Sequence, residues 1–164
     1  MNTSSAGIRN LLFDLGGVII NLDRQRCVDA LTALGDEKAD EMLSLSVQRG
    51  TLMDLEEGKI SPSDFFKRMR QKIGKAVSDE EIVHALNELL IGIPLDRLTL
   101  LRKLRQRFNV MMLSNTNPIM FDTKIAECFA QEGLSITDYF DDVYLSYRLK
   151  SCKPDIAIFK KVIE

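Results

Sequence analysis

The sequence predicts an α/β fold with a parallel sheet, and three observations lead to this class. Residues 9–14 contain an apolar run over 11–13, and we read them as a short strand covered on both faces, as parallel sheets require. Two further strands, over 109–114 and 142–147, alternate with helices in the second half of the chain. Alternation of this kind is typical of βαβ units. We therefore expect a Rossmann-like, three-layer αβα sheet.

Between the first strand and Pro94 the sequence carries helical signals and no convincing strand over 24–93. An amphipathic run over 24–34 is stopped by a glycine, and a second helix follows the cap residue Ser61. A third helix opens with a capping box that starts at Ser78. These helices predict a small helical bundle inserted between two strands of the sheet.

The insertion divides the chain into two expected domains. Residues 1–21 and 94–164 form the Rossmann-like core, and residues 22–93 form a helical cap. After Pro94 the core contains a helix over 95–108 with four leucines on one side, and another over about 119–130. A last helix is entered through Pro154.

Composition excludes several classes of partner. Lysine and arginine (22) do not outnumber aspartate and glutamate (24), so nothing indicates a nucleic acid or an anionic membrane. No apolar run approaches the roughly 18 residues that span a bilayer, and the N-terminus is too polar for a signal peptide. Three scattered cysteines fit a reducing compartment. We expect a cytoplasmic protein; the oligomeric state stays open.

Three polar side chains follow the ends of the three predicted strands. Asp14 and Ser114 end the first two, and Lys153 lies between the third strand and its helix. In parallel sheets such positions meet at one edge, where ligands bind. A carboxylate nucleophile, a hydroxyl and an ammonium suit a phosphate monoester. Each of these residues alone would be interpreted as a turn or surface residue. Their joint position at one edge of the sheet favours a binding or catalytic site.

Two glycines and a metal complete this interpretation. Gly16 and Gly17 would let the backbone turn tightly and approach a ligand without a Cβ in the way. An anionic nucleophile that meets an anionic substrate calls for a divalent cation, usually Mg²⁺.

At these residues the chain resembles the haloacid-dehalogenase-like (HAD) hydrolase superfamily. The stretches "FDLGGV", "LSNTN" and "KPDIAIF" look like its first three motifs, in order and around a helical insert. The resemblance implies Asp14 as nucleophile and Lys153 as charge neutraliser. It also implies Ser114 on the substrate phosphate, and Mg²⁺ held partly by Asp14 and the Gly16 carbonyl. Asn115, next to Ser114, is expected among the substrate-binding residues.

The form of the first motif looks most like a subgroup of sugar-phosphate phosphatases with a small helical cap. The resemblance implies that the cap closes over the site and selects a small phosphorylated metabolite. Arg26 matches a position near the cap entrance in that subgroup and is expected at the substrate site.

The chain departs from the family pattern at two points. Family phosphatases usually carry a second aspartate two residues after the nucleophile as general acid and base, and Gly16 stands there. The family's fourth, acidic motif is not found before Glu164. We therefore expect the C-terminal strands to be absent from this chain, which would leave Phe13 at an unpaired edge.

Three functions compete. The first is a Mg²⁺-dependent phosphatase that forms an aspartyl phosphate on Asp14. The second is a non-catalytic phosphate-binding or regulatory protein, which Gly16 and the missing acidic motif favour. The third is a haloacid dehalogenase, although "DLGGV" does not resemble that branch. We rank the phosphatase first.

Overall fold

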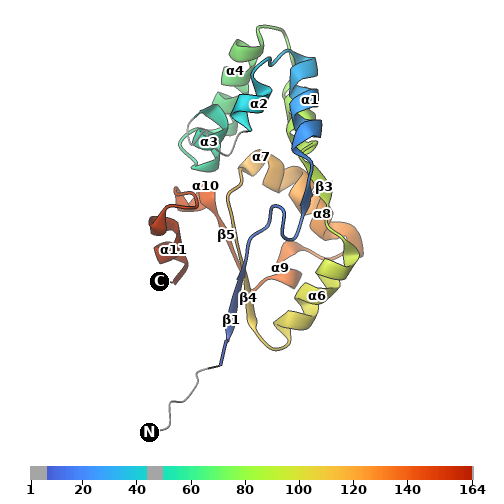
Figure 1. The fold of residues 1–164 in the computed structure, drawn as a ribbon, viewed down its shortest axis with the longest axis vertical. Coiled ribbons are helices and arrows are strands. Elements are labelled where there is room, and N and C mark those ends of the chain that lie inside the picture. Colours follow the sequence, from blue (N-terminus) through green and yellow to red (C-terminus); the bar gives the residue numbers. More distant parts are fainter. Residues whose placement is uncertain (1–6, 44–49, 164) are drawn as a thin grey trace.

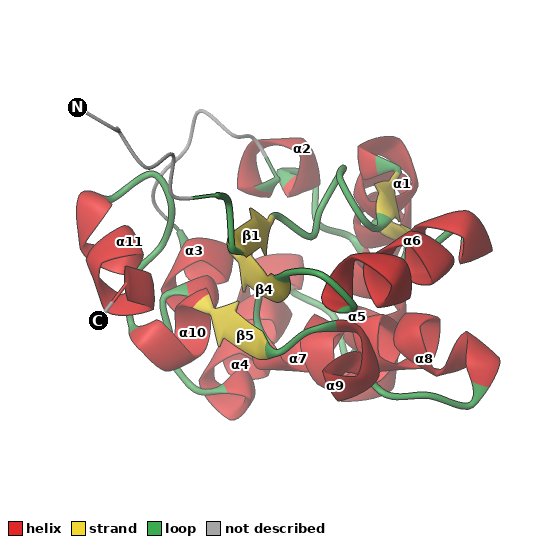
Figure 2. Cartoon of the chain, turned by 90° about the horizontal axis from the view of Figure 1, so that it is seen from below, coloured by secondary structure: helices red, strands yellow, loops and turns green. Residues whose placement is uncertain are grey.

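The computed structural model describes residues 7–43 and 50–163, and a three-stranded parallel sheet forms its centre. The strands β1 (Asn10–Phe13), β4 (Asn109–Ser114) and β5 (Asp142–Leu145) lie in the order β1-β4-β5. Helices lie on both sides of these strands (Figure 2). The expected α/β class with a helix-covered parallel sheet is confirmed.

The apolar strand residues explain why β4 is central. Val110 and Met112 of β4 are fully buried, and Met112 pairs with Phe13 on one side and with Val143 on the other. Among the described residues β1 pairs with β4 alone, and Leu12 on it is 41% exposed. The expectation that 9–14 is a buried strand covered on both faces is therefore wrong, because no residue of β1 is buried at this edge of the sheet.

A second, two-stranded sheet corrects the expectation that 24–93 holds no strand. β2 (Asn21–Leu22) and β3 (Leu90–Gly92) pair antiparallel with an irregular register. They connect the parallel sheet to the helices above it (Figure 1). Strands of two and three residues are too short to produce a period-two pattern, so the sequence gives no signal for them.

Among the described residues, five helices lie between β2 and β3. They are α1 (Arg24–Leu34), α2 (Ala39–Met42), α3 (Thr51–Glu56), α4 (Pro62–Ile73) and α5 (Asp79–Asn87). Ser61 and Ser78 cap α4 and α5, as expected, and the capping box predicted at Ser78 is matched by a second one at Ser61. Gly35 ends α1 in the left-handed region. A core that includes the buried Phe65 holds them together.

These helices sit beyond the carboxyl ends of the strands, at the upper end of the molecule in Figure 1. We call them the helical segment α1–α5. The division into a cap over 22–93 and a core over 1–21 and 94–164 stays a prediction.

The remaining helices flank the sheet. On one side lie α6 (Leu95–Arg105), α8 (Ala126–Phe129) and α9 (Ile136–Tyr139), and on the other lie α10 (Ser146–Leu149) and α11 (Ile156–Ile163). The helix expected over 119–130 begins as α7 (Pro118–Met120), passes through a π-helical turn at Phe121–Ile125 into α8, and ends in a 3₁₀ turn at Ala130–Glu132.

Two details differ from the sequence prediction. The third strand ends at Leu145 rather than at 147, because Ser146 starts a short helix and is fully buried. On α6, Leu98 and Leu101 are buried, but Leu95 at its first turn is 56% exposed. In the described part of the chain, no helix has the length and apolarity needed to cross a membrane.

Candidate active site

The structure brings Asp14 and Lys153 into direct contact. Asp14 follows β1, and Lys153 lies in the loop before α11; the Lys153 Nζ is 2.7 Å from the Asp14 Oδ1. The same oxygen accepts a hydrogen bond from the Leu15 N–H at 2.7 Å. The Asp14 side chain remains 46% exposed. One carboxylate oxygen is therefore oriented by two donors, while the group stays accessible to a ligand.

Asn115 fixes the loop that carries Lys153. Its Oδ1 accepts the Lys153 backbone N–H at 2.8 Å, and its Nδ2 donates to the Lys153 carbonyl at 2.9 Å. The Lys153 Nζ also donates to the Leu113 carbonyl at 3.1 Å. Both ends of the Asn115 amide are thus engaged with protein, so in this structure Asn115 orients Lys153 instead of pointing free toward a substrate.

Ser114 ends β4 and is buried, with its hydroxyl donating a long hydrogen bond of 3.3 Å to the Asn115 carbonyl. The Ser146 side chain holds the loop that follows Ser114. The Ser146 Oγ accepts the Thr116 N–H and donates to the Thr116 carbonyl, both at 3.0 Å. Sequence reasoning missed this support, because Ser146 was counted as part of the third strand.

The two glycines that follow Leu15 in the Asp14 loop differ in backbone conformation and in the space around them. Gly17 has a φ of +72° and donates its N–H to the Ile20 carbonyl at 2.9 Å, so the turn uses the left-handed region. Gly16 lies outside that region; a Cβ there would meet the Leu22 side chain at 3.3 Å. The expected tight turn is present, and its left-handed backbone conformation requires a glycine at position 17.

Arg26 lies on α1 and is engaged elsewhere. Its Nε donates to the Glu88 Oε2 at 2.8 Å, and its Nη2 contacts the same oxygen. The structure does not bring Arg26 into contact with Asp14 or Lys153, and its expected role at the substrate site stays a prediction.

A cavity of about 740 Å³ opens between the helical segment and the loops that carry Asn115 and Lys153. Its walls are contributed by α1, α2, α3 and α4 on one side and by these two loops on the other. Charged side chains around it are Arg24, Lys38, Glu41, Glu56, Lys72 and Lys153. Burial raises the pKa of the Glu56 carboxyl to about 7.

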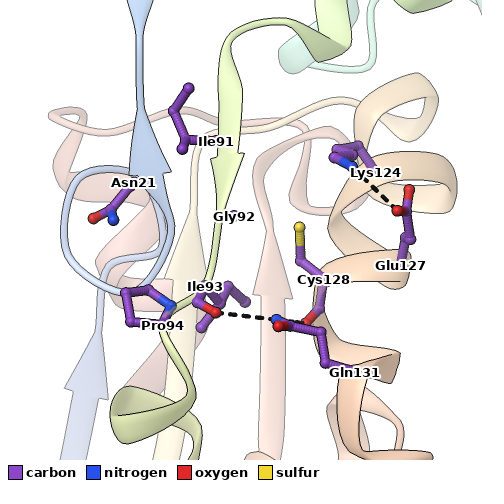
Figure 3. A pocket seen from close by; sticks show the side chains of 9 residues that line it. All are labelled: Asn21, Ile91, Gly92, Ile93, Pro94, Lys124, Glu127, Cys128 and Gln131. Carbon is purple, nitrogen blue, oxygen red and sulfur yellow. Dashed lines mark hydrogen bonds and ion pairs between the residues drawn. The ribbon is translucent and has the colours of Figure 1, made fainter.

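A smaller cavity of about 380 Å³ lies between the β2–β3 pair and the helical run that contains α8 (Figure 3). Gln131 closes one side of it by donating to the Ile93 carbonyl at 3.0 Å and the Cys128 carbonyl at 2.7 Å. Of Asp14, Ser114 and Lys153, only Lys153 lines the larger cavity, and none of the three lines this smaller one, which is therefore separate from the candidate chemistry.

The donor atoms of the site determine whether it can bind Mg²⁺. Among the residues that the structure describes, no three His, Cys, Asp or Glu side chains gather into a metal-binding group. Mg²⁺ is, however, commonly held by one or two carboxylates, with substrate phosphate and water completing the shell. The Asp14 carboxylate and a backbone carbonyl such as that of Gly16 are hard oxygen ligands, and they fit this pattern.

Comparisons with known proteins place the chain in a family. Residues 8–164 match the family model of haloacid dehalogenase-like hydrolases. A D-ribitol-5-phosphate phosphatase of Bacteroides thetaiotaomicron is 37% identical over 157 residues, which cover 96% of this chain and 76% of the relative.

Two solved structures support the same placement. A HAD family enzyme of Bacteroides thetaiotaomicron, crystallised as a mutant with magnesium and inorganic phosphate, is 41% identical and superimposes with a TM-score of 0.91, covering 95% of this chain and 77% of that one. A HAD-like family hydrolase from Porphyromonas gingivalis is 33% identical with a TM-score of 0.87, covering 95% and 75%. Family model, sequence relative and fold agree over nearly the whole chain, which therefore belongs to the haloacid dehalogenase-like hydrolases.

Proposed function

We propose that this protein is a Mg²⁺-dependent phosphatase that hydrolyses a small, sugar-phosphate-like metabolite through an aspartyl phosphate on Asp14. The expected enzyme class, a phosphoric monoester hydrolase, is confirmed by the 37% identical phosphatase. The expected cofactor is confirmed by a 41% identical relative that holds magnesium and phosphate. The substrate, the intermediate and a cytoplasmic location are proposals.

The contact between Asp14 and Lys153 is the observation that carries this proposal. Lys153 binds one Asp14 oxygen at 2.7 Å and leaves the other oxygen of a half-exposed carboxylate available for attack on phosphorus. The ammonium lies where negative charge develops during phosphoryl transfer, and it neutralises that charge as a compact cation.

The other residues hold the phosphoryl group. The Ser114 hydroxyl and the backbone N–H groups of the loops after β1 and β4 would bind its non-bridging oxygens. When bound by Asp14 and the Gly16 carbonyl, Mg²⁺ supplies Lewis-acid stabilisation of the phosphate charge. Asn115 acts indirectly, because its side chain holds the Lys153 backbone in place.

The helical segment α1–α5 would select the substrate. It supplies most of the wall of the 740 Å³ cavity above Lys153, which is large enough for a sugar or polyol phosphate. It also touches the sheet domain directly, since the Lys150 Nζ donates to the Gly58 carbonyl at 2.6 Å. This supports its assignment as a cap over residues 22–93.

A second candidate function is phosphate binding without turnover. Gly16 favours it, because a residue without a side chain cannot transfer protons next to the nucleophile.

The test is release of phosphate from p-nitrophenyl phosphate and a panel of sugar and polyol phosphates, by protein expressed from its whole reading frame. Release with Mg²⁺, lost with EDTA and in Asp14→Asn, is the expected result. Phosphate binding without release would favour the binding protein. Metal-independent halide release from a 2-haloacid would favour the dehalogenase.

A further inference from the structure

Hydrolysis of an alkyl phosphate by this route needs a group that carries protons. The leaving oxygen departs as an alkoxide unless it is protonated, and the attacking water must lose a proton in the second step. Gly16 on the nucleophile loop has no side chain. The chain's single histidine, His84, is 78% exposed on α5 beside Glu88. The carrier must therefore come from another element of the site.

Glu56, the last residue of α3, is the carboxyl group best placed for this task. It is partly buried and lines the same cavity as Asn115 and Lys153. Within residues 7–43 and 50–163, its carboxyl has no hydrogen-bond or ion-pair partner. Burial raises the pKa of the Cys152 thiol, and the charges of Glu56 and Glu57 raise it further.

The turn that follows Glu56 is held against α10. Two residues after Glu56, the Gly58 carbonyl accepts a hydrogen bond from the Lys150 Nζ at 2.6 Å. The backbone there approaches α10 so closely that a Cβ on residue 58 would clash with the Tyr147 carbonyl oxygen. Glu56 is therefore held at the boundary between the helical segment and the loops of the candidate site.

We propose that Glu56 is the general acid and base of this phosphatase, in the place that Gly16 cannot fill; the inference rests on the proposed function. In the first step an Asp14 oxygen bonds to phosphorus and the bond to the leaving oxygen breaks. The proton of the Glu56 carboxyl moves to that oxygen, which gives the free alcohol.

In the second step water attacks the aspartyl phosphate. The Glu56 carboxylate takes a proton from the water, the bond between phosphorus and Asp14 breaks, and inorganic phosphate leaves. Glu56 and Asp14 return to their starting states, so the cycle consumes one ester and one water. A carboxyl that titrates near neutrality suits both halves of this cycle.

Glu41 is the other acid in the wall of the cavity, and it is exposed on α2. The cations that face the same space, and would influence the titration of Glu56, are Arg24, Lys38, Lys72 and Lys153. Lys72 is bound to the buried Asp36 at 2.8 Å, and Arg24 to Asp40 at 2.6 Å, which leaves Glu56 free of both.

The experiment compares Glu56→Gln with Glu57→Gln in single-turnover and steady-state assays with Mg²⁺. Glu57 is the matched control, because it is adjacent, contacts Lys59 and does not line the cavity. For a polyol phosphate, E56Q should lower the single-turnover rate by roughly 10²–10⁴-fold. For p-nitrophenyl phosphate, whose leaving group needs no proton, the burst of p-nitrophenolate should persist while steady turnover slows.

Each other result overturns the inference. A wild-type single-turnover rate in E56Q, an equal loss of the burst and of alkyl ester cleavage, or a change in KM alone would all exclude proton transfer by Glu56. Glu56→Asp, which keeps the carboxyl, should restore part of the rate if E56Q is impaired for this reason. If wild-type protein and D14N are equally inactive on every ester, the proposed function fails, and this inference fails with it.

Discussion

Asn115 and Lys153, 38 residues apart in the chain, are joined by two hydrogen bonds between one side-chain amide and one backbone unit. The Oδ1 of Asn115 accepts the Lys153 N–H at 2.8 Å, and its Nδ2 donates to the Lys153 carbonyl at 2.9 Å. The loop after β4 thereby sets the position of the cation that contacts Asp14. Precise placement of Lys153 depends on a residue that need not touch the substrate.

Asn115→Ala should release this loop. Loss of two partly buried hydrogen bonds should lower the free energy of unfolding by about 1–3 kcal/mol. Displacement of Lys153 should lower kcat by roughly 10–100-fold, with a smaller change in KM. Urea unfolding and steady-state kinetics measure both effects. Asn115→Asp keeps the acceptor but places a second oxygen against the Lys153 carbonyl, so it should not restore kcat. A wild-type kcat in N115A would contradict the positioning role.

Gly17→Ala tests the turn after the nucleophile. Its φ of +72° lies in the left-handed region, where a Cβ is unfavourable by roughly 1–2 kcal/mol. Gly133 is a matched control, because its φ is also +72° and a Cβ at either position would meet nothing within 4 Å. Both variants should lose similar stability in urea unfolding. Only G17A should also lose phosphatase activity; an equal effect on activity in G133A would contradict a local role for the turn.

The strand ends that hold Asp14 and Ser114 are predictable from sequence. A polar residue that closes an apolar run marks the carboxyl end of a strand, and parallel strands bring such ends together. The burial of these strands is less predictable, since β4 is mostly buried and β1 is not. Lys153 follows by the same topology. The pairing of Asn115 with the Lys153 backbone does not follow, because it depends on how two loops from different strands meet.

Glu56 and Ser146 show why the rest of the site could not be predicted. The sequence around Glu56 reads as an ordinary helix end with two consecutive glutamates, and only packing of α3 on α10 turns one of them to the cavity. Ser146 reads as the continuation of a strand, and its buried hydrogen bonds to Thr116 become visible only in three dimensions. Both depend on tertiary contacts that leave no local pattern.

Gly58→Ala should loosen the contact between α3 and α10. A Cβ at this position meets the Tyr147 carbonyl oxygen, and the φ of +60° adds strain. Because backbone must shift to relieve the clash, we expect a loss of about 2–4 kcal/mol. Gly74→Ala, at a φ of +70° with open space around it, should lose only about 1–2 kcal/mol. Equal losses in denaturant unfolding would show that α10 does not hold this segment.

The pH dependence of stability gives a test of Glu56 that is independent of catalysis. Burial raises the pKa of its carboxyl from 4.5 to about 7, so the folded state holds this proton more tightly than the unfolded chain does. Below pH 4.5 both states are protonated and the full contribution to stability is present. As the pH rises from 4.5 through 7, the unfolded chain ionises first and this contribution is lost.

Glu56→Gln cannot ionise and should lack this loss. At pH 8 the variant should therefore be more stable than the wild type by roughly 1–3 kcal/mol, whereas at pH 4 the two should be nearly equal. Urea unfolding of both proteins across this pH range measures the difference in their free energies of unfolding. The contributions of the other titrating groups are the same in both proteins and cancel in this difference. Parallel curves for E56Q and wild type would mean that Glu56 titrates as an exposed carboxyl, and it would then lack the near-neutral pKa that suits a proton carrier.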